Sequence, residues 1–325
     1  MSETTMQAIV AHEPGGPEVL RPAEVPVPEP GPREVLVRTE ATGVNFIETY
    51  QRSGVYPVDF PFTAGSEGTG EVVAVGSEVT TVRTGQRVAT SEATRTYAQF
   101  FTVDEDKALP VPDGMDPQTA GALPLQGLTA HYLVRSTFPV QPGQTAVVTA
   151  ASGGVGGLTI QLLKRIGATV IALTSTRDKA ETAKRLGADH VLGYEGFAEH
   201  VRELTDGLGA DVVYDSVGRT TFDESLAATR VRGTTVLFGG SSGQVPPLDL
   251  QRLNSSGALY VTRPSLAYYT RDRDERTWRW GELMDAVTSG GLEVRVGATY
   301  PLDDAAAAHR DLESRGTQGK LLLLP

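Results

Sequence analysis

The chain has 325 residues and no cysteine, and its 40 Asp and Glu outnumber its 29 Lys and Arg, for a formal net charge of −11. This length predicts two domains. A chain without cysteine forms neither a disulfide nor a cysteine-ligated zinc or iron–sulfur site. The acidic balance argues against nucleic-acid and membrane partners. Because neither a transmembrane run nor a signal peptide is recognisable, we expect a cytoplasmic protein.

The N-terminal part of the chain is predicted to be a β-rich domain. Short segments with β-branched residues, such as Glu34–Arg38, Gly70–Val75 and Arg87–Ala89, are separated by Pro and Gly. Many short strands with turns of this kind indicate a barrel or a sandwich.

The middle of the chain alternates short apolar runs with helical patterns. The six runs are Thr145–Ala150, Ala168–Thr174, His190–Leu192, Asp211–Asp215, Thr234–Phe238 and Ala258–Thr262. Such alternation predicts βαβ units and an α/β fold with a doubly wound parallel sheet. Six strands are the number expected of a complete dinucleotide-binding sheet.

The C-terminal part is predicted to return to the first domain. Beyond Pro264 the pattern predicts a helix at about 273–288, a strand at 294–297 and a helix at about 302–313. The chain closes on Lys320–Leu324, a short apolar strand that needs a sheet to join. The β-rich domain is the expected host, so this domain is predicted to be discontinuous.

The segment Thr145–Gly157 carries the strongest motif. A predicted strand runs into Ala151–Gly156, which matches G-x-G-x-x-G with alanine in the first glycine position, and a helix follows. Gly153 would let the backbone approach a pyrophosphate, and Gly156 would allow close packing of helix on strand. As the first turn of a six-strand alternation, the motif predicts a dinucleotide site. The alternative is a glycine-rich turn without a ligand.

The end of the second strand indicates which dinucleotide binds. NAD sites usually place an acid there, about 20 residues after the loop, to accept from the ribose 2′-OH. Here Thr174 and Ser175 take that position, with Arg177 and Lys179 just beyond. Neutral donors and cations suit a 2′-phosphate, so NADPH is favoured. Asp178 is the competing ribose acid, but we expect it in the first turn of the following helix.

Two later strand ends are candidates for the nicotinamide. Asp215–Gly218 ends the fourth strand, and Phe238–Gly243, which includes Ser241, ends the fifth. Ligands of open α/β sheets bind outside the carboxyl ends of the strands, where glycine permits close backbone approach. Ordinary turn chemistry is the alternative for each segment.

Five segments together show a family resemblance. They are Gly15–Leu20, Gly43–Tyr50, Ala150–Gly156, Tyr214–Gly218 and Tyr260–Ser265. In these segments, in order from about Met6 to Pro325, the chain resembles the zinc-free NADPH:quinone oxidoreductases. These form the zeta-crystallin-like branch of the medium-chain dehydrogenase/reductase superfamily.

Two positions sharpen the resemblance to the zinc-free branch. Zinc-dependent relatives have a Cys, and a His in the triplet Gly-His-Glu, where this chain has Asn45 and Ser66. The five histidines show no ligand spacing. We therefore expect no metal.

The resemblance implies a fold and an assembly. A GroES-like β domain would span residues 1–125 and 265–325, and a Rossmann domain 126–264, with the active site in the cleft between them. Homodimers of the family pair the edge strands of their Rossmann sheets. Ala258–Thr262 is the expected edge, since a bare apolar edge strand is a liability.

The resemblance also implies site residues. The nicotinamide end would involve Asn45, Thr129, Ser216, Phe238 and Gly239, and the phosphates would lie on Gly153, Gly154, Val155 and Gly156. The 2′-phosphate would involve Ser175, Lys179, Tyr194 and Arg315. Tyr50, Tyr56 and Arg263 would line the acceptor side with Asn45. Gly240 and Gln126 depart from the Asn and Lys expected of near relatives.

The implied chemistry is metal-independent hydride transfer from C4 of NADPH to a quinone. No strong general acid is evident, which a quinone tolerates because its phenolate product takes a proton from water. Tyr50 or Tyr56 could donate to the acceptor oxygen or simply pack, and Asn45 is a further donor. An enone or 2-alkenal reductase, which would need a proton donor to the α-carbon, is the alternative. A structural or RNA-binding role is disfavoured by the charge.

Overall fold

The computed structural model describes residues 4–314 and 316–325. Two compact units make up the chain. The first contains the chain up to Gln126 with Trp280–Thr288 and Val294–Pro325, and the second contains Gly127–Arg279 with Ser289–Glu293. Residues 265–279, which the sequence assigns to the β domain, thus lie in the second unit. The exact ends of the folding domains stay a prediction.

The second unit is built on one parallel sheet. Its strands are β9 (Thr145–Val148), β10 (Thr169–Leu173), β11 (His190–Leu192), β12 (Ala210–Asp215), β13 (Thr229–Leu237) and β14 (Tyr260–Thr262). They are hydrogen-bonded in the order β11-β10-β9-β12-β13-β14, and every pairing is parallel. This is the strand order of a dinucleotide-binding fold. The predicted doubly wound sheet is therefore confirmed.

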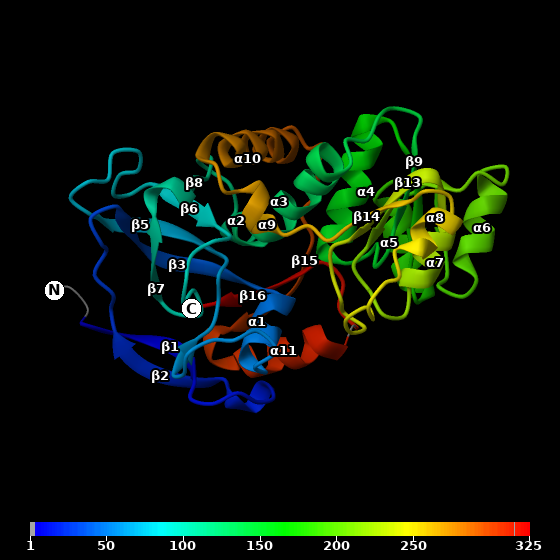
Figure 1. Ribbon diagram of the computed structural model, residues 1–325. Helices are drawn as coiled ribbons and strands as arrows, with labels where there is room; N and C mark the ends of the chain where they lie inside the picture. Colours follow the sequence, from blue (N-terminus) through cyan, green and yellow to red (C-terminus); the bar gives the residue numbers. More distant parts are fainter. Residues whose placement is uncertain (1–3, 315) are drawn as a thin grey trace. The chain divides into compact units, whose positions relative to one another are not determined.

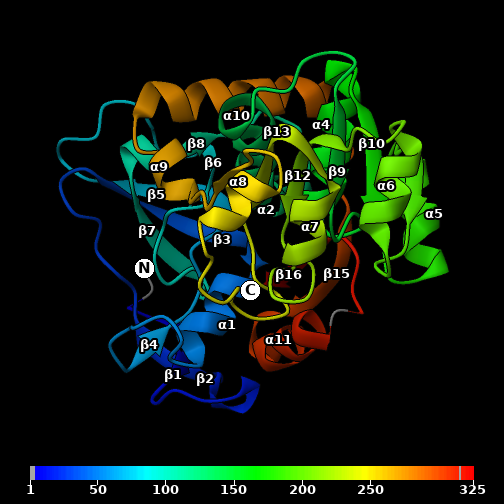
Figure 2. The same ribbon diagram turned by 45° about the vertical axis from the view of Figure 1, so that its right-hand side comes forward.

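Helices cover both faces of this sheet (Figure 1, Figure 2). Val148 packs in one core with Ile160 of α4 (Gly154–Ile166), whereas its neighbour Val147 packs in another with Val201 of α6 (Phe197–Leu204). Successive strand residues point to opposite faces, so both faces are buried and the strands are apolar throughout. α5 (Arg177–Arg185) shares the core of α4, and α7 (Phe222–Ala228) shares that of α6.

Of the remaining helices of the second unit only α10 is long, and two of them extend into the first unit. They are α3 (Pro124–Tyr132), which begins in the first unit, α8 (Gln251–Ser255), α9 (Leu266–Tyr269) and α10 (Arg273–Thr288), which ends in the first unit. In the part of the chain that the structure describes, no helix has the length and apolar character needed to cross a membrane.

The first unit is a β domain with two sheets. One sheet has the order β2-β1-β4, and the other has the order β15-β16-β3-β5-β6-β8, with β7 also paired to β3. The strands are β1 (Thr5–Ala11), β2 (Arg21–Pro26), β3 (Glu34–Val44), β4 (Phe62–Thr63), β5 (Gly68–Val75), β6 (Arg87–Thr90), β7 (Phe100–Asp104), β8 (Leu109–Pro110), β15 (Val296–Pro301) and β16 (Lys320–Leu324). The helices wholly within it are α1 (Phe46–Arg52), α2 (Pro117–Ala122) and α11 (Ala305–Ser314).

The C-terminal strand returns to this unit, as predicted. β16 pairs antiparallel with β3, with Leu321 opposite Val44 and Leu322 opposite Gly43. In Figure 1 the red strand β16 accordingly lies against the blue strand β3. Leu321 is buried in a core that also contains Ala305 and Ala308 of α11. The β domain is therefore discontinuous, and its last strand places residues from the end of the chain beside residues near position 45.

Candidate functional site

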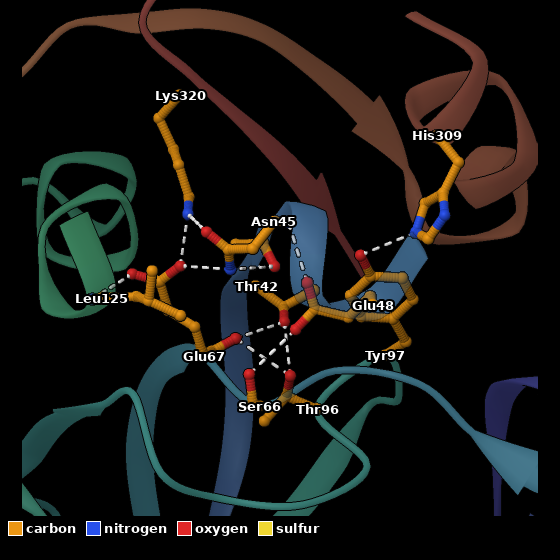
Figure 3. Close-up of polar contacts among 11 residues, drawn as sticks. Thr42, Asn45, Glu48, Ser66, Glu67, Thr96, Tyr97, Leu125, His309 and Lys320 are labelled. Atoms are coloured by element: carbon orange, nitrogen blue, oxygen red, sulfur yellow. Dashed lines mark hydrogen bonds and ion pairs between the residues drawn. The ribbon is translucent and has the colours of Figure 1, made fainter. Parts of the chain in front are cut away.

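Three strand ends of the first unit converge on a cluster of buried polar side chains (Figure 3). Asn45 follows the last residue of β3, Glu67 precedes the first residue of β5, and Lys320 is the first residue of β16. β3 pairs with both of the other strands, as the pairs Thr42 with Gly68 and Val44 with Leu321 show. The register of the sheet therefore brings together three residues that are far apart in the sequence.

The side chain of Asn45 is held at both of its polar atoms. Its Nδ2 donates to Glu67 Oε2 over 2.9 Å, and its Oδ1 accepts from Lys320 Nζ. Lys320 also forms an ion pair with Glu67 Oε2, while Glu67 Oε1 accepts from the Leu125 N–H over 2.7 Å. Asn45 is 6% exposed, Lys320 1% and Glu67 0%. An ion pair buried this deeply survives only when further hydrogen bonds satisfy its charges, as they do here.

Gly43 makes room for this cluster. A Cβ at this position would lie 2.0 Å from Glu67 Oε2 and 2.7 Å from Lys320 Cε. The backbone carbonyl of Glu67 accepts from the hydroxyls of Thr42, at 2.6 Å, and Thr96, at 2.9 Å. The side chain of Glu67 is thus fixed by the ion pair and its backbone by these two hydroxyls.

A second buried carboxylate, Glu48, lies one helical turn beyond Asn45. It accepts from the Asn45 N–H and from the Ser66 hydroxyl, each over 2.9 Å. Burial raises the pKa of Glu48 from 4.5 to about 7, against the opposing effects of the Ser66 hydrogen bond and the Lys320 charge. Burial and the nearby negative charges of Glu48 and Glu67 also raise the pKa of the Tyr97 phenol.

The two tyrosines expected on the acceptor side lie together in this unit. The Tyr50 ring is on α1 and meets the Tyr56 ring edge-on, with 5.4 Å between centroids. The Tyr56 N–H donates to the Tyr50 carbonyl over 3.0 Å. Tyr56 is 40% exposed, whereas Tyr50 is half-buried. Their arrangement is compatible with either a packing or a donor role.

Sequence reasoning missed the residues that anchor α1. Arg52 is buried at the end of this helix, donates to Glu313 Oε1 over 2.8 Å and lies 3.2 Å from His309 Nδ1. Because a guanidinium can only donate, Nδ1 of His309 is the acceptor and its Nε2–H donates to Tyr97 Oη over 3.0 Å. Burial and the Arg52 charge lower the pKa of His309 to about 3, so this histidine is neutral.

The predicted phosphate loop of the second unit has the geometry of an anion cradle. Gly153 lies just before α4, and a Cβ on Gly156 would lie 2.4 Å from the Ala150 carbonyl oxygen. Only glycine therefore allows α4 to pack this closely on the loop. The first N–H groups of α4, including those of Gly154 and Val155, have no acceptor within the helix and carry its positive dipole. These residues fit the pyrophosphate of a dinucleotide.

The residues expected at a 2′-phosphate fall in different environments. Ser175 is exposed after β10, whereas Lys179 is half-buried in the first turn of α5. Asp178 lies in the same turn, as the sequence predicts. Tyr194 Oη accepts from the Ala150 N–H over 2.9 Å, so this tyrosine is hydrogen-bonded to the start of the phosphate loop. Arg315 lies outside the described residues.

A buried carboxylate, which the sequence singled out only as part of the strand end Asp215–Gly218, organises the end of β12. Asp215 is fully buried and accepts from the Val217 and Gly218 N–H groups at 2.8 and 3.0 Å. It also accepts from the hydroxyls of Thr221 and Ser225, each at 2.8 Å. These donors follow Asp215 closely in the chain. The sequence signal for this buried carboxylate was an acidic residue at the end of an apolar strand, followed closely by Ser, Thr and Gly residues that can donate hydrogen bonds to it.

The structure brings together Ser216, Phe238, Gly239 and Ser241, four of the residues expected near the nicotinamide. The Ser216 N–H donates to Thr149 Oγ1 over 2.9 Å, which joins the ends of β12 and β9. A Cβ on Gly239 would lie 2.4 Å from the Ser216 carbonyl oxygen, and this oxygen accepts from the Ser241 N–H over 3.2 Å. The Phe238 N–H donates to the Asp215 carbonyl over 2.9 Å. Three strand ends therefore form one rim at the carboxyl edge of the sheet.

Two further predicted residues belong to other elements of the second unit. Thr129 is buried on α3. Arg263 is exposed directly after β14, close enough to Tyr132 for its charge to oppose the rise in the pKa of that buried phenol.

Comparison with known proteins covers nearly the whole chain. Residues 31–137 match the family model of the alcohol dehydrogenase GroES-like domain, and residues 154–276 match that of the zinc-binding dehydrogenases. The chain is similar to a quinone oxidoreductase of Pseudomonas aeruginosa, with 42% identity over 96% of this chain and 97% of that protein. It is also similar to a 2-haloacrylate reductase of Burkholderia sp., with 40% identity over 98% of this chain and 99% of that protein. A mycobacterial protein solved in complex with NADPH has a TM-score of 0.96 and 49% identity over 98% of this chain and 100% of that chain.

A Rossmann sheet with a glycine-rich first turn, in one chain with a discontinuous GroES-like β domain, defines the medium-chain dehydrogenase/reductase class. Within this class the chain belongs to the quinone oxidoreductase family, of the zeta-crystallin-like branch. The resemblance seen in the sequence is thereby confirmed. Despite the name of one matching family model, the described residues contain no group of three or more His, Asp or Glu placed to hold a metal ion.

Proposed function

We propose that this protein reduces quinones with NADPH, by hydride transfer and without a metal. The observation that carries the proposal is the end of β10, where neutral Thr174 and Ser175 stand in place of a ribose acid. Arg177 and Lys179 follow in the first turn of α5. Asp178, the competing acid, also lies in that turn, where the helix dipole stabilises it. The NADPH complex of the mycobacterial neighbour supports the same cofactor.

The residues of the second unit would hold most of the cofactor, which supplies a hydride from C4 of its nicotinamide when bound. Gly153 to Gly156 would take the pyrophosphate. The remaining contacts would come from Ser175, Lys179, Tyr194 and Arg315 around the 2′-phosphate, and from Thr129, Ser216, Phe238, Gly239 and Ser241 around the nicotinamide.

The acceptor side would consist of Asn45, Tyr50, Tyr56 and Arg263. A quinone that receives a hydride becomes a hydroquinone monoanion, which takes one proton from water. The residues therefore need only orient the quinone and donate hydrogen bonds to the oxygen on which negative charge develops. The amide of Asn45 and the hydroxyls of Tyr50 and Tyr56 are the donors proposed for this purpose.

The test is an NADPH-oxidation screen with 9,10-phenanthrenequinone, benzoquinones and enones, repeated with NADH. We expect turnover of quinones, faster with NADPH than with NADH. Absence of quinone turnover, or equal rates with both cofactors, would overturn the proposal.

An enone or 2-alkenal reductase is the second candidate function. The similarity to the 2-haloacrylate reductase of Burkholderia sp. favours it, since that name denotes reduction of an activated alkene. Such a reaction needs a proton at the α-carbon after hydride attack on the β-carbon. A higher kcat/KM for 2-chloroacrylate or an enone than for every quinone in the screen would select this function.

We also propose a homodimer, working in the cytoplasm, that pairs two copies of the edge strand β14. Among the described residues β14 is paired on one side only, with β13. Tyr260 on β14 is 61% exposed and Val231 on β13 is 64% exposed. An exposed apolar edge strand is a template for pairing with a second chain.

A further inference from the structure

The buried ion pair between Lys320 and Glu67 is a costly feature that the proposed chemistry has not used. Burying two charges costs several kcal/mol per ion, so an ion pair is a poor way to stabilise a core that apolar residues could fill. Neither side chain is itself exposed, at 1% for Lys320 and 0% for Glu67. Any role in catalysis must therefore act through a neighbour, and the neighbour that both contact is Asn45.

The contacts of Asn45 fix the direction of its carboxamide. Its oxygen faces an ammonium group and its nitrogen faces a carboxylate (Figure 3). A rotation of the amide by half a turn would place the NH₂ group against the ammonium and the oxygen against the carboxylate. Both new contacts would be repulsive, so Lys320 and Glu67 together select one of two orientations that are otherwise nearly equivalent in shape.

This orientation leaves one donor uncommitted. The amide nitrogen carries two hydrogens, and one is directed at Glu67 Oε2 over 2.9 Å. Among the described residues the second has the Gly43 carbonyl alone, at 3.5 Å, which is at the limit of a hydrogen bond. Asn45 also retains a small exposed fraction, 6%, that its two partners lack. The carboxamide can therefore present a donor outside the cluster.

We propose that Lys320 and Glu67 are positioning residues, which hold the Asn45 carboxamide so that its second N–H donates to the oxygen of the acceptor during hydride transfer. The inference rests on the proposed quinone reduction. In this view the two buried charges ensure that the Asn45 side chain presents an N–H donor, and not its carbonyl oxygen, to the acceptor. Glu48 accepts from the backbone N–H of Asn45 and from Ser66, and so fixes the backbone that carries this side chain.

Two double variants separate positioning from stability. Glu67→Gln with Lys320→Met removes both charges and, with them, the preference that they impose on the orientation of Asn45. Asn45→Asp with Glu67→Gln keeps one anion beside Lys320, and the introduced amide can donate to the introduced carboxylate, but the second N–H at position 45 is lost. As a matched control, Glu40→Gln with Arg87→Met removes an ion pair of the same unit, with contacts of 2.6 and 2.9 Å, that does not involve Asn45.

We expect Asn45→Asp with Glu67→Gln to lower kcat for quinone reduction by about 100- to 1,000-fold, as the loss of one positioned donor does in other enzymes. Glu67→Gln with Lys320→Met should lower kcat only about twofold, because an amide with two equally populated orientations presents its donor about half of the time. The Kd of NADPH for Glu67→Gln with Lys320→Met, measured by fluorescence titration, should stay within about twofold, since the phosphate loop and Lys179 belong to the other unit. The isotope effect from NADPH deuterated at C4 should rise, because hydride transfer becomes more fully rate-limiting. The control pair should lower Tm and leave kcat unchanged.

A readout independent of activity is the NMR spectrum of the Asn45 side chain. In the wild type the NOEs of its amide protons should fit one orientation of the carboxamide, and in Glu67→Gln with Lys320→Met they should fit a mixture of two. NOEs that fit a single orientation in both proteins, or a kcat of Asn45→Asp with Glu67→Gln within twofold of the wild type, would overturn the inference. A wild type that reduces no quinone would instead refute the proposed function, while the NMR comparison would still decide whether the two charges orient Asn45.

Discussion

Glu48 gives the sharpest quantitative prediction, because its pKa sets a pH window for stability. In the folded chain burial raises this pKa from 4.5 to about 7. The unfolded chain therefore loses the proton first as the pH rises, and the folded state is increasingly disfavoured between pH 4.5 and 7. At about 1.4 kcal/mol for each pKa unit, the full effect is about 3 kcal/mol.

The variant Glu48→Gln removes this titration with little change of shape. Its amide oxygen can still accept from the Asn45 N–H, and its NH₂ group can donate to the Ser66 hydroxyl. We expect the free energy of unfolding of Glu48→Gln, relative to the wild type, to rise by about 2–3 kcal/mol from about pH 5 to about pH 8. Urea unfolding at several pH values in this range measures the difference.

The prediction concerns the difference in unfolding free energy between Glu48→Gln and the wild type, because the titration of His309 changes the stability of each protein in the opposite direction. Its pKa is lowered from 6.5 to about 3, so its contribution to stability is present above pH 6.5 and is lost as the pH falls toward 3. This contribution is common to both proteins and cancels in their difference. Glu199→Gln, on the exposed side of α6, controls for the loss of one negative charge. A difference between Glu48→Gln and the wild type that does not change with pH would refute the reasoning.

Two further predictions concern the cofactor and the assembly. Lys179→Ala should raise the KM for NADPH and leave that for NADH nearly unchanged, and the loss of one charge-assisted hydrogen bond would lower the NADPH preference roughly 10- to 150-fold. An unchanged ratio of the two kcat/KM values would exclude Lys179 from the 2′-phosphate site. Tyr260→Glu should convert a dimer into a monomer in analytical ultracentrifugation, because it places a charge on the edge of β14. A variant with the mass of the wild type at every concentration would show that β14 is not the interface.

The fold was predictable where the pattern is local. Six apolar runs alternating with helices predicted the six parallel strands, because strands buried on both faces are apolar throughout. The helix expected at about 273–288 is α10 (Arg273–Thr288). The strand expected at 294–297 instead begins at Val296 and extends to Pro301, since its limits depend on pairing with β16.

The cluster around Asn45 was only partly predictable, because its residues come from distant parts of the sequence. Asn45 was singled out by its position in a motif, but Lys320 entered only as the first residue of a terminal strand. Its partner Glu67 lies 253 residues away in the sequence, and only the pairing of β3 with both β5 and β16 joins them. The one local signal is that Lys320 directly precedes four leucines. A strand as apolar as this one is buried, so the charge of its first residue is expected to be buried with it.

The same cluster bears on whether a metal site could be rebuilt in this chain. Zinc-dependent relatives have a Cys where Asn45 stands and a Gly-His-Glu triplet where this chain has Gly65, Ser66 and Glu67. In this chain the positive charge beside Glu67 is the ammonium of Lys320, which is bonded to both Glu67 and Asn45. A divalent cation at the same point would meet this buried ammonium at short range, where the repulsion is screened far less than in water.

Asn45→Cys with Ser66→His should therefore bind no zinc while Lys320 remains, although it supplies the two ligand types that the zinc-dependent relatives have. Adding Lys320→Met removes the competing charge and leaves Glu67 as an unpaired carboxylate, so zinc binding should appear in this triple variant. Isothermal titration with Zn²⁺ compares the two, with Lys320→Met alone as the control for zinc bound by the carboxylates only. Equal affinity of the double and the triple variant would show that the ammonium of Lys320 does not occupy the place of a metal.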